Sequence, residues 1–312
     1  MRDEVVGEAA VLEVDPDRAV AEVDSPALAR TPSEADSLIL QATVGCSYNE
    51  CSFCGMYRDK RFRVRKLDDL RREIAWASEH VGPVRKVFLA DGDALMAKAS
   101  FLADLLAELR GAFGPLARVS CYASPQSLQV RTVAEMRGLR EGGLSLYYLG
   151  IESGHDRVLA RLVKGVDAAE MVATAGKAHE AGVKLSTMIL LGAGGRALSL
   201  EHARESARVV NAIQPRFLST LVMTPVEGTP LWEEARRGEV DELSPPETAR
   251  ELRELLAHLV LERTVFRSNH ASNHLSLAGT LSKDREAMLA ALDAVLARPE
   301  RAAFRPDRLR GL

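Results

Sequence analysis

The chain has 312 residues, of which 46 % are hydrophobic and 27 % are charged, and its formal net charge is −3. This balance is typical of a globular protein with a sizeable core, and it excludes a disordered, collagen-like or disulfide-scaffold chain. The small negative charge creates no basic field, so nucleic acid is not indicated as a partner. No run of 18 apolar residues occurs and the N-terminus is acidic, which predicts a cytoplasmic protein with no membrane partner.

Residues 1–35 form an acidic leading segment. Within it, two apolar stretches flank Asp15, Pro16 and Asp17, a pattern typical of a short hairpin or N-terminal β-ribbon. We therefore expect three units: this lead over 1–35, a core unit over 36–235, and a C-terminal extension over 236–312.

From Ser37 onward, short apolar runs alternate with segments of helical period. The expected strands are 38–42, 86–90, 119–123, 144–150, 185–191 and 217–223, and the expected helices are 67–79, 101–109, 133–140, 157–163, 168–181 and 200–213. Six strand–helix units in a row favour parallel strands joined by right-handed crossovers. They are too few for a closed eight-stranded barrel, so the predicted α/β fold is a partial (β/α)6 TIM-like barrel, with a doubly wound sheet as the alternative.

Beyond Thr229 this alternation ends. Helical patterns over 251–263 and 283–296 predict a helical C-terminal extension in a position to cap the barrel.

The most specific feature is a group of three cysteines, Cys46, Cys51 and Cys54, directly after the first core strand. Three thiolates on one loop can converge on a metal centre, and sulfur ligands suit iron–sulfur clusters, zinc or copper(I). Structural zinc takes four protein ligands, and no fourth Cys or His lies near this loop. The remaining Cys121 falls in an expected strand, where a free cysteine packs as a small hydrophobe. Three ligands without a local fourth suit a four-iron cluster with one open iron.

With this triad the chain resembles the radical S-adenosylmethionine (radical SAM) superfamily over about residues 37–235, nearest to its coproporphyrinogen oxidase-like and methylthiotransferase-like group. The usual spacing is C-x3-C-x2-C, whereas this chain has C-x4-C-x2-C. The resemblance implies a [4Fe–4S] cluster on the triad and S-adenosylmethionine as cofactor. It also implies an enzyme that cleaves this cofactor reductively to a 5′-deoxyadenosyl radical, which abstracts hydrogen from an unidentified substrate. The electron would come from a reducing partner such as flavodoxin or ferredoxin.

Further positions near the first two strands match the superfamily. Phe53, directly before the third cysteine, matches the aromatic residue that backs the adenine ring. Asp91, Gly92 and Asp93 follow the second strand at the place of a Gly-Gly-Glu motif, which implies binding of the methionine ammonium. The alternative for Asp91–Asp93 is a solvated acidic turn or helix cap.

Two later strands also end in matching residues. Glu152 and Ser153 fit a GxES motif, whose glutamate would bond the ribose hydroxyls or the ammonium of the cofactor. Gly192 and Gly194 lie in a glycine-rich turn that the resemblance places near adenine. A plain tight turn is the alternative for these two glycines.

In the C-terminal extension, Asn269, His270, Asn273 and His274 repeat Asn-His at a spacing of four. On a helix the two histidines would share a face, as in two-ligand zinc motifs, but no third ligand is evident. We expect this polar segment to border the open mouth of the barrel on the substrate side, and local turn chemistry is the alternative.

Two rival classes remain open at this stage. One is a non-catalytic iron–sulfur or haem-handling protein on the same fold, which release of 5′-deoxyadenosine would exclude. The other is a zinc-binding structural module that uses the triad and one histidine, which would be colourless. The sequence identifies neither the substrate nor a catalytic acid–base pair.

Overall fold

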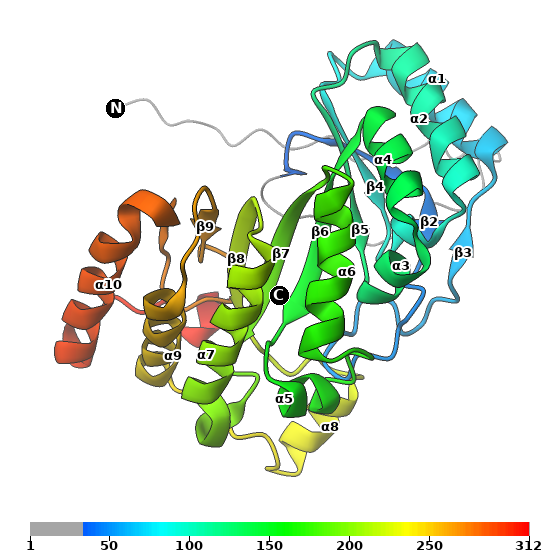
Figure 1. Cartoon of the computed structure of the whole chain (residues 1–312). Coiled ribbons are helices and arrows are strands. Elements are labelled where there is room, and N and C mark those ends of the chain that lie inside the picture. Colours follow the sequence, from blue (N-terminus) through cyan, green and yellow to red (C-terminus); the bar gives the residue numbers. More distant parts are fainter. Residues whose placement is uncertain (1–33, 312) are drawn as a thin grey trace.

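The computed structural model describes residues 34–311, which form an open sheet covered by helices (Figure 1). The sheet has eight strands in the order β1-β4-β5-β6-β7-β8-β9-β10. Their bounds are β1 Leu38–Gln41, β4 Lys86–Ala90, β5 Arg118–Ala123, β6 Leu144–Glu152, β7 Lys184–Leu191, β8 Phe217–Val222, β9 Val265–Arg267 and β10 Ala278–Thr280. A separate two-stranded ribbon pairs β2 (Thr43–Val44) with β3 (Arg63–Val64). The hairpin expected within residues 1–35 lies outside the described residues.

All neighbouring strands from β1 to β9 are parallel, and only β10 runs antiparallel to its neighbour. The six strands predicted from the sequence are β1 and β4 to β8, each within two residues of its expected ends. Near-continuous apolar runs marked them because both faces of a parallel sheet are covered. The predicted α/β partial barrel is therefore confirmed.

Most of the helices line one face of the sheet in chain order, and two short ones lie below the strands in the view of Figure 1. Their bounds are α1 Leu67–His80, α2 Ala99–Phe113, α3 Pro125–Val130, α4 Val133–Glu141, α5 Asp156–Arg161, α6 Ala168–Glu180, α7 Gly195–Ile213, α8 Pro230–Arg236, α9 Pro245–His258 and α10 Leu281–Ala297. Contacts link α1 to α2, α2 to α4, α4 to α6, α6 to α7, α7 to α9 and α9 to α10. Together they shield the main hydrophobic core, which lies between them and the sheet.

The inner, concave face of the sheet has its own small core, built on aromatic side chains. The rings of Phe88, Tyr122 and Tyr148 meet edge to face, with centroids 5.1 to 5.9 Å apart. The buried Glu34 carboxylate accepts hydrogen bonds there from Tyr148 and Ser120 and forms an ion pair with Arg118. A charged carboxylate can be buried because these donors replace water.

Local sequence signals set most helix ends. Asp167 caps α6 by accepting from the backbone N–H of Glu170, and Gly182 follows the helix with a left-handed φ of +75°. Helix α7 differs from the expectation, because it begins at Gly195 rather than at Leu200. The glycine turn leads directly into the helix, which places Ser199 inside α7, where its side chain is buried.

The C-terminal extension contains strands as well as the two expected helices. Helix α9 ends at His258, five residues before the predicted end, and β9 and β10 add two strands to the sheet. These three-residue strands carry no apolar run long enough to show in the sequence. The stretch between them is irregular, so the Asn-His pairs do not lie on a helix.

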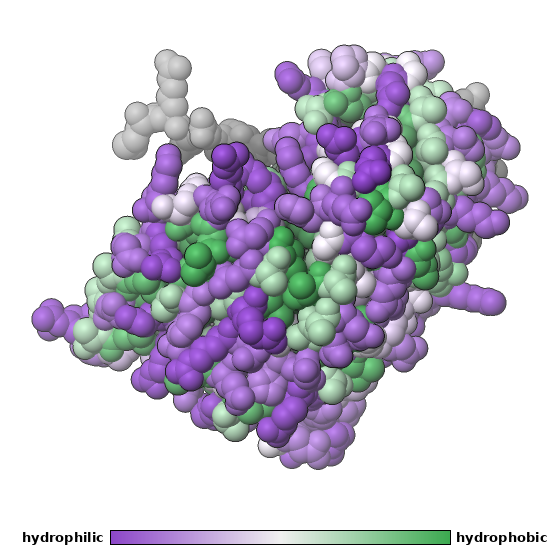
Figure 2. Space-filling model, viewed as in Figure 1, coloured by the Kyte–Doolittle hydropathy of each residue, from purple (hydrophilic) through white to green (hydrophobic). Residues whose placement is uncertain are grey.

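Hydrophilic residues cover most of the visible face, and hydrophobic residues appear in patches between the helices (Figure 2). Among the described helices, none combines the length and apolarity needed to cross a membrane.

Candidate functional site

The cysteine loop leaves the carboxyl end of the first strands, where Cys46, Cys51 and Cys54 are free and partly exposed. Burial raises the pKa of all three thiols, that of Cys51 to about 11, and charge on Cys46 and Cys54 adds to the rise at Cys51. The fourth cysteine, Cys121, is buried in the main core within β5, as expected. The three loop thiols are therefore the accessible sulfur ligands of the described chain.

The candidate metal ligands are the three thiols of the cysteine loop. Across residues 34–311, no three Cys, His, Asp or Glu side chains gather closely enough to hold one metal ion. The thiolates of a four-iron cluster each bind a different iron, so they stand further apart than the ligands of one zinc ion. Three accessible thiols on one loop match the number of protein ligands in a four-iron cluster with one open iron.

The turn after β4 fixes the start of this loop. The Asp91 carboxylate accepts hydrogen bonds from Gly45 N (3.1 Å) and from Gln41 Nε2 (2.9 Å). Gly92 N donates to the Gly45 carbonyl, and a Cβ at Gly92 would stand only 2.5 Å from the Tyr57 ring. Glycine is thus required where Tyr57 covers the turn.

Asp93 ties the cysteine loop to the end of β5. Its carboxylate accepts from the Ser47 hydroxyl and from both the hydroxyl (2.7 Å) and the backbone N–H (3.1 Å) of Ser124. Burial raises the pKa of Asp93, although these donors favour its charged form. Asp91 and Asp93 therefore support the loop that carries Cys46, and their predicted contact with the cofactor stays a prediction.

Arg58 supports the other end of the loop. Its guanidinium donates to the carbonyls of Cys54 (2.9 Å) and Cys51 (2.5 Å). Because one planar guanidinium donates to both carbonyls, it fixes the spacing of the backbone at Cys51 and Cys54.

Glu152, at the end of β6, is held by a buried cation. Lys164 Nζ donates to Glu152 Oε1 at 3.0 Å, and the two residues are 8 % and 7 % exposed. Burial disfavours the lysine charge, but Glu152 and the nearby Cys51 and Cys54 outweigh it and raise the pKa of Lys164. A Cβ at Gly150 would fall 1.9 Å from Glu152 Oε1, so the carboxylate folds back over a position where only glycine fits.

The other predicted cofactor residues lie around α7. Ser153 Oγ is 2.8 Å from His202 Nδ1, so its hydroxyl is directed at this helix. Gly192 has a φ of +83°, and a Cβ at Gly194 would stand 3.1 Å from His202 Cβ. Phe53 packs against the small apolar cluster that contains Ala193, from the same turn. The structure thus places Phe53 beside the cluster to which the glycine turn contributes, and the binding of adenine by Phe53 and this turn stays a prediction.

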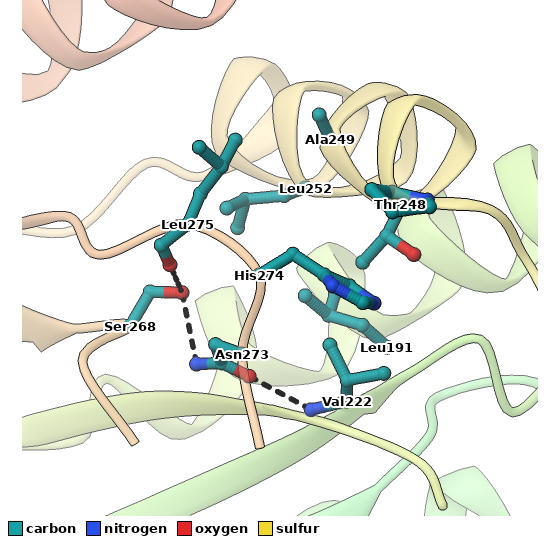
Figure 3. A pocket seen from close by; sticks show the side chains of 10 residues that line it. Leu191, Val222, Thr248, Ala249, Leu252, Ser268, Asn273, His274 and Leu275 are labelled. Carbon is teal, nitrogen blue, oxygen red and sulfur yellow. Dashed lines mark hydrogen bonds between the residues drawn. The ribbon is translucent and has the colours of Figure 1, made fainter. Parts of the chain in front are cut away.

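The Asn-His segment closes the carboxyl end of β8. The Asn273 amide donates to Thr220 O (2.7 Å) and its carbonyl accepts from Val222 N (2.8 Å), so it continues the pairing of the strand. His274 points into a small pocket between α9 and the strand ends (Figure 3). Arg305 donates to the carbonyls of His270 and Asn273, which fixes the loop from outside.

These contacts give Asn273 and His274 structural roles at the carboxyl edge of the sheet. Asn269 is exposed and His270 partly exposed. A place beside the substrate stays a prediction for all four residues.

Two residues near the cysteine loop were not singled out from the sequence as a site. Lys164 follows α5 shortly after two arginines of that helix, and no local signal reveals that it returns to Glu152. Gln126, at the start of α3, donates to the Lys164 carbonyl, while its buried Oε1 has no partner among the described residues. A buried amide oxygen without a donor fits a ligand that carries an N–H or O–H group.

Solved structures of similar fold come from several enzymes. Methylornithine synthase matches with a TM-score of 0.53 and 17 % identity over 83 % of this chain and 81 % of that one. Coproporphyrinogen III oxidase of Escherichia coli, a radical SAM enzyme, matches with a TM-score of 0.52 and 18 % identity over 71 % and 51 % of the two chains. A maturase of the [FeFe]-hydrogenase gives 0.51 and 16 % over 74 % and 52 %. Identities this low show a shared fold.

Sequence comparison gives the family. The chain is 24 % identical over 201 residues to an uncharacterized methyltransferase of Pyrococcus horikoshii, a match that covers 63 % of this chain and 41 % of that protein. The chain thus spans less than half the length of this relative. The family model of the radical SAM superfamily matches residues 40–207. This range is more than half of the chain and includes the triad, Glu152 and the glycine turn. The chain therefore belongs to the radical SAM superfamily.

Proposed function

We propose that the protein is a radical SAM enzyme in which Cys46, Cys51 and Cys54 hold a [4Fe–4S] cluster. The observation that carries the proposal is the buried Glu152–Lys164 pair, which lies beside two of the three accessible thiols. When bound, the cluster and S-adenosylmethionine supply reductive cleavage of the sulfonium to a 5′-deoxyadenosyl radical that abstracts a substrate hydrogen.

The residues of the chain have separate tasks in this proposal. The Lys164 ammonium attracts the carboxylate of the methionine moiety and favours the thiolate form of Cys51. Glu152 accepts hydrogen bonds from the ribose hydroxyls or the ammonium, and Gln126 Oε1 offers a second acceptor. Phe53 covers one face of adenine, and the Gly192 turn allows close backbone approach. Asp91 and Asp93 keep the loop in place around the ammonium.

The electron source and the substrate belong to the proposal as well. We expect flavodoxin or ferredoxin as the reductant, because both deliver single electrons at low potential. The Pyrococcus relative is named a methyltransferase, so methyl transfer is one outcome that product analysis has to include.

The test is anaerobic reconstitution with iron and sulfide, followed by reduction with dithionite in the presence of S-adenosylmethionine. Release of 5′-deoxyadenosine and methionine supports the enzyme, and S-adenosylhomocysteine would reveal methyl transfer. A brown protein that binds the cofactor but never cleaves it would favour the non-catalytic iron–sulfur alternative. A colourless protein with one zinc per chain would contradict the proposal.

A further inference from the structure

A network of buried polar side chains lies along the face of α7 that meets the sheet. Ser199, His202 and Ser206 lie on this face, and His202 and Ser206 are fully buried. Polar groups that no water reaches require partners inside the protein. Their partners lie in the loop after β6, among the last residues of β7 and in α9.

At one end of this polar network lies Glu251, which α9 contributes from the C-terminal extension. Its carboxylate accepts from Gly192 N (2.7 Å) and from Ser199 Oγ (2.5 Å), and the residue is fully buried. The Gly192 amide belongs to the turn with a left-handed φ. Glu251 therefore fixes the conformation of this turn directly through its backbone.

The other end is His202, which reaches the loop that carries Glu152. His202 Nε2 lies 3.1 Å from the Leu190 carbonyl and 3.6 Å from Glu251 Oε1, so this nitrogen faces two acceptors and carries the proton. Nδ1 then accepts from the Ser153 hydroxyl at 2.8 Å, and that hydroxyl accepts from His155 N at 3.0 Å.

The same loop packs on the backbone of α7 without a gap. Gly154 N donates to Ser206 Oγ at 2.9 Å, and a Cβ at Gly154 would stand 2.1 Å from the Glu205 carbonyl. The position of α7 therefore sets the position of the loop after β6, because hydrogen bonds join the two.

An apolar contact would hold α7 and α9 against the sheet at a lower desolvation cost than a buried carboxyl and imidazole. The hydrogen bonds of the polar network also fix the orientation of two groups, one backbone amide in the Gly192 turn and one hydroxyl beside Glu152. Both fixed groups belong to the candidate cofactor loops.

We propose that Glu251 and His202 are positioning residues that hold the Gly192 turn and the Glu152 loop in register for one S-adenosylmethionine molecule. The inference rests on the proposed function and extends it, because it makes α9 a part of the cofactor site. A protein that lacked α9 would lose the acceptor of the Gly192 amide.

The first measurement needs no cofactor. In hydrogen exchange of the full chain, Glu251→Leu is expected to speed exchange of the amides in 192–195, because Gly192 N loses its acceptor. Glu251→Gln keeps an acceptor oxygen and is expected to resemble the wild type. Glu34→Leu is the matched control, because it also removes a buried carboxylate, and it should leave exchange in 192–195 unchanged. Unchanged exchange in Glu251→Leu would overturn the inference.

The second measurement is S-adenosylmethionine binding by calorimetry on the reconstituted protein. We expect Glu251→Leu to weaken binding about tenfold or more at unchanged iron content, and Glu251→Gln to restore it to within about threefold. Should Glu251→Leu fail to fold, Ser199→Ala replaces it, since Ser199 bonds Glu251 and neither cofactor loop; a loss of about threefold is expected. Wild-type affinity in these variants would overturn the inference alone. A wild type that binds no S-adenosylmethionine would overturn the proposed function as well.

Discussion

Lys164 donates a hydrogen bond of 3.0 Å to Glu152 from a position twelve residues further along the chain. Helix α5 and the turn after it lie between them, so the pair joins the end of β6 to a segment whose carbonyls accept hydrogen bonds from Ser52 of the cysteine loop. Both residues are buried, which makes the pair sensitive to the loss of either partner.

Glu152→Gln is expected to weaken S-adenosylmethionine binding at least tenfold while the iron content stays near that of the wild type. It should also destabilise the protein by about 3 kcal/mol, because the Lys164 charge is left without its counter-charge. The double variant Glu152→Gln/Lys164→Met removes both charges and is expected to regain much of this stability but not the binding. Calorimetry and urea unfolding separate the two effects. Loss of iron in Glu152→Gln, with normal affinity in the remaining holoprotein, would contradict the assignment.

Cys121→Ala is expected to keep both the cluster and 5′-deoxyadenosine release, because Cys121 lies in the core within β5. Replacement of Cys46, Cys51 or Cys54 by Ala should abolish both. Iron and sulfide analysis and the EPR spectrum of the reduced protein, with and without S-adenosylmethionine, provide the measurement. A closed cluster with four protein ligands would show itself by cluster loss in Cys121→Ala and a spectrum that the cofactor leaves unchanged.

Asp93→Ala is expected to lower the free energy of unfolding by about 3 kcal/mol, because the buried donors of Ser47 and Ser124 lose their acceptor. Ser47 adjoins Cys46, so iron incorporation should fall as well. Asp93→Asn keeps an acceptor oxygen and should lie between the two. If iron incorporation is normal and only S-adenosylmethionine binding is lost, Asp93 acts on the cofactor rather than on the loop.

Glu251→Gln and His202→Gln are expected to change the pH dependence of stability in opposite directions. Burial raises the pKa of Glu251 from 4.5 to about 7, so the folded state keeps a proton that the unfolded chain has released, and stability falls as pH rises across this range. Burial, together with the facing His155, lowers the pKa of His202 from 6.5 to about 4, so stability rises with pH between these values.

In the wild type the two slopes oppose each other between about pH 4.5 and 6.5. In Glu251→Gln the free energy of unfolding should rise with pH, because only the contribution of His202 remains. In His202→Gln it should fall with pH, and each slope is at most about 1.4 kcal/mol per pH unit. Urea unfolding of each variant across this range provides the check. Slopes of the same sign in both variants would contradict the assigned protonation states.

Strands and triad were predictable because their signals are local. Runs such as residues 87–90 are apolar throughout, and Cys46, Cys51 and Cys54 lie close together in the sequence on one loop. The strands β9 and β10 were not, because three residues carry no period and their pairing depends on β8. The Asn-His spacing of four suggested a helix, but Asn273 is fixed by Val222 and Thr220 from β8, a tertiary contact without local signal.

The buried polar side chains that support the candidate site could not be predicted from the sequence either. The expected helix began at Leu200, directly after Ser199, and only the fold shows that Ser199 and His202 lie inside α7 and face Glu251. Arg58 and Lys164 resemble surface cations in the sequence, because burial of a charge depends on partners that come from other elements.

Chain order and sheet order coincide from β1 and β4 through to β10. During synthesis each strand therefore finds its partner already in place, and no strand has to enter between two that are paired. The loops that close are those between consecutive strands, so the entropy lost at each step stays small. The contact of Glu251 with Gly192 is an exception, since it waits until α9 has left the ribosome. The nascent barrel can therefore assemble its cysteine loop before the glycine turn is fixed.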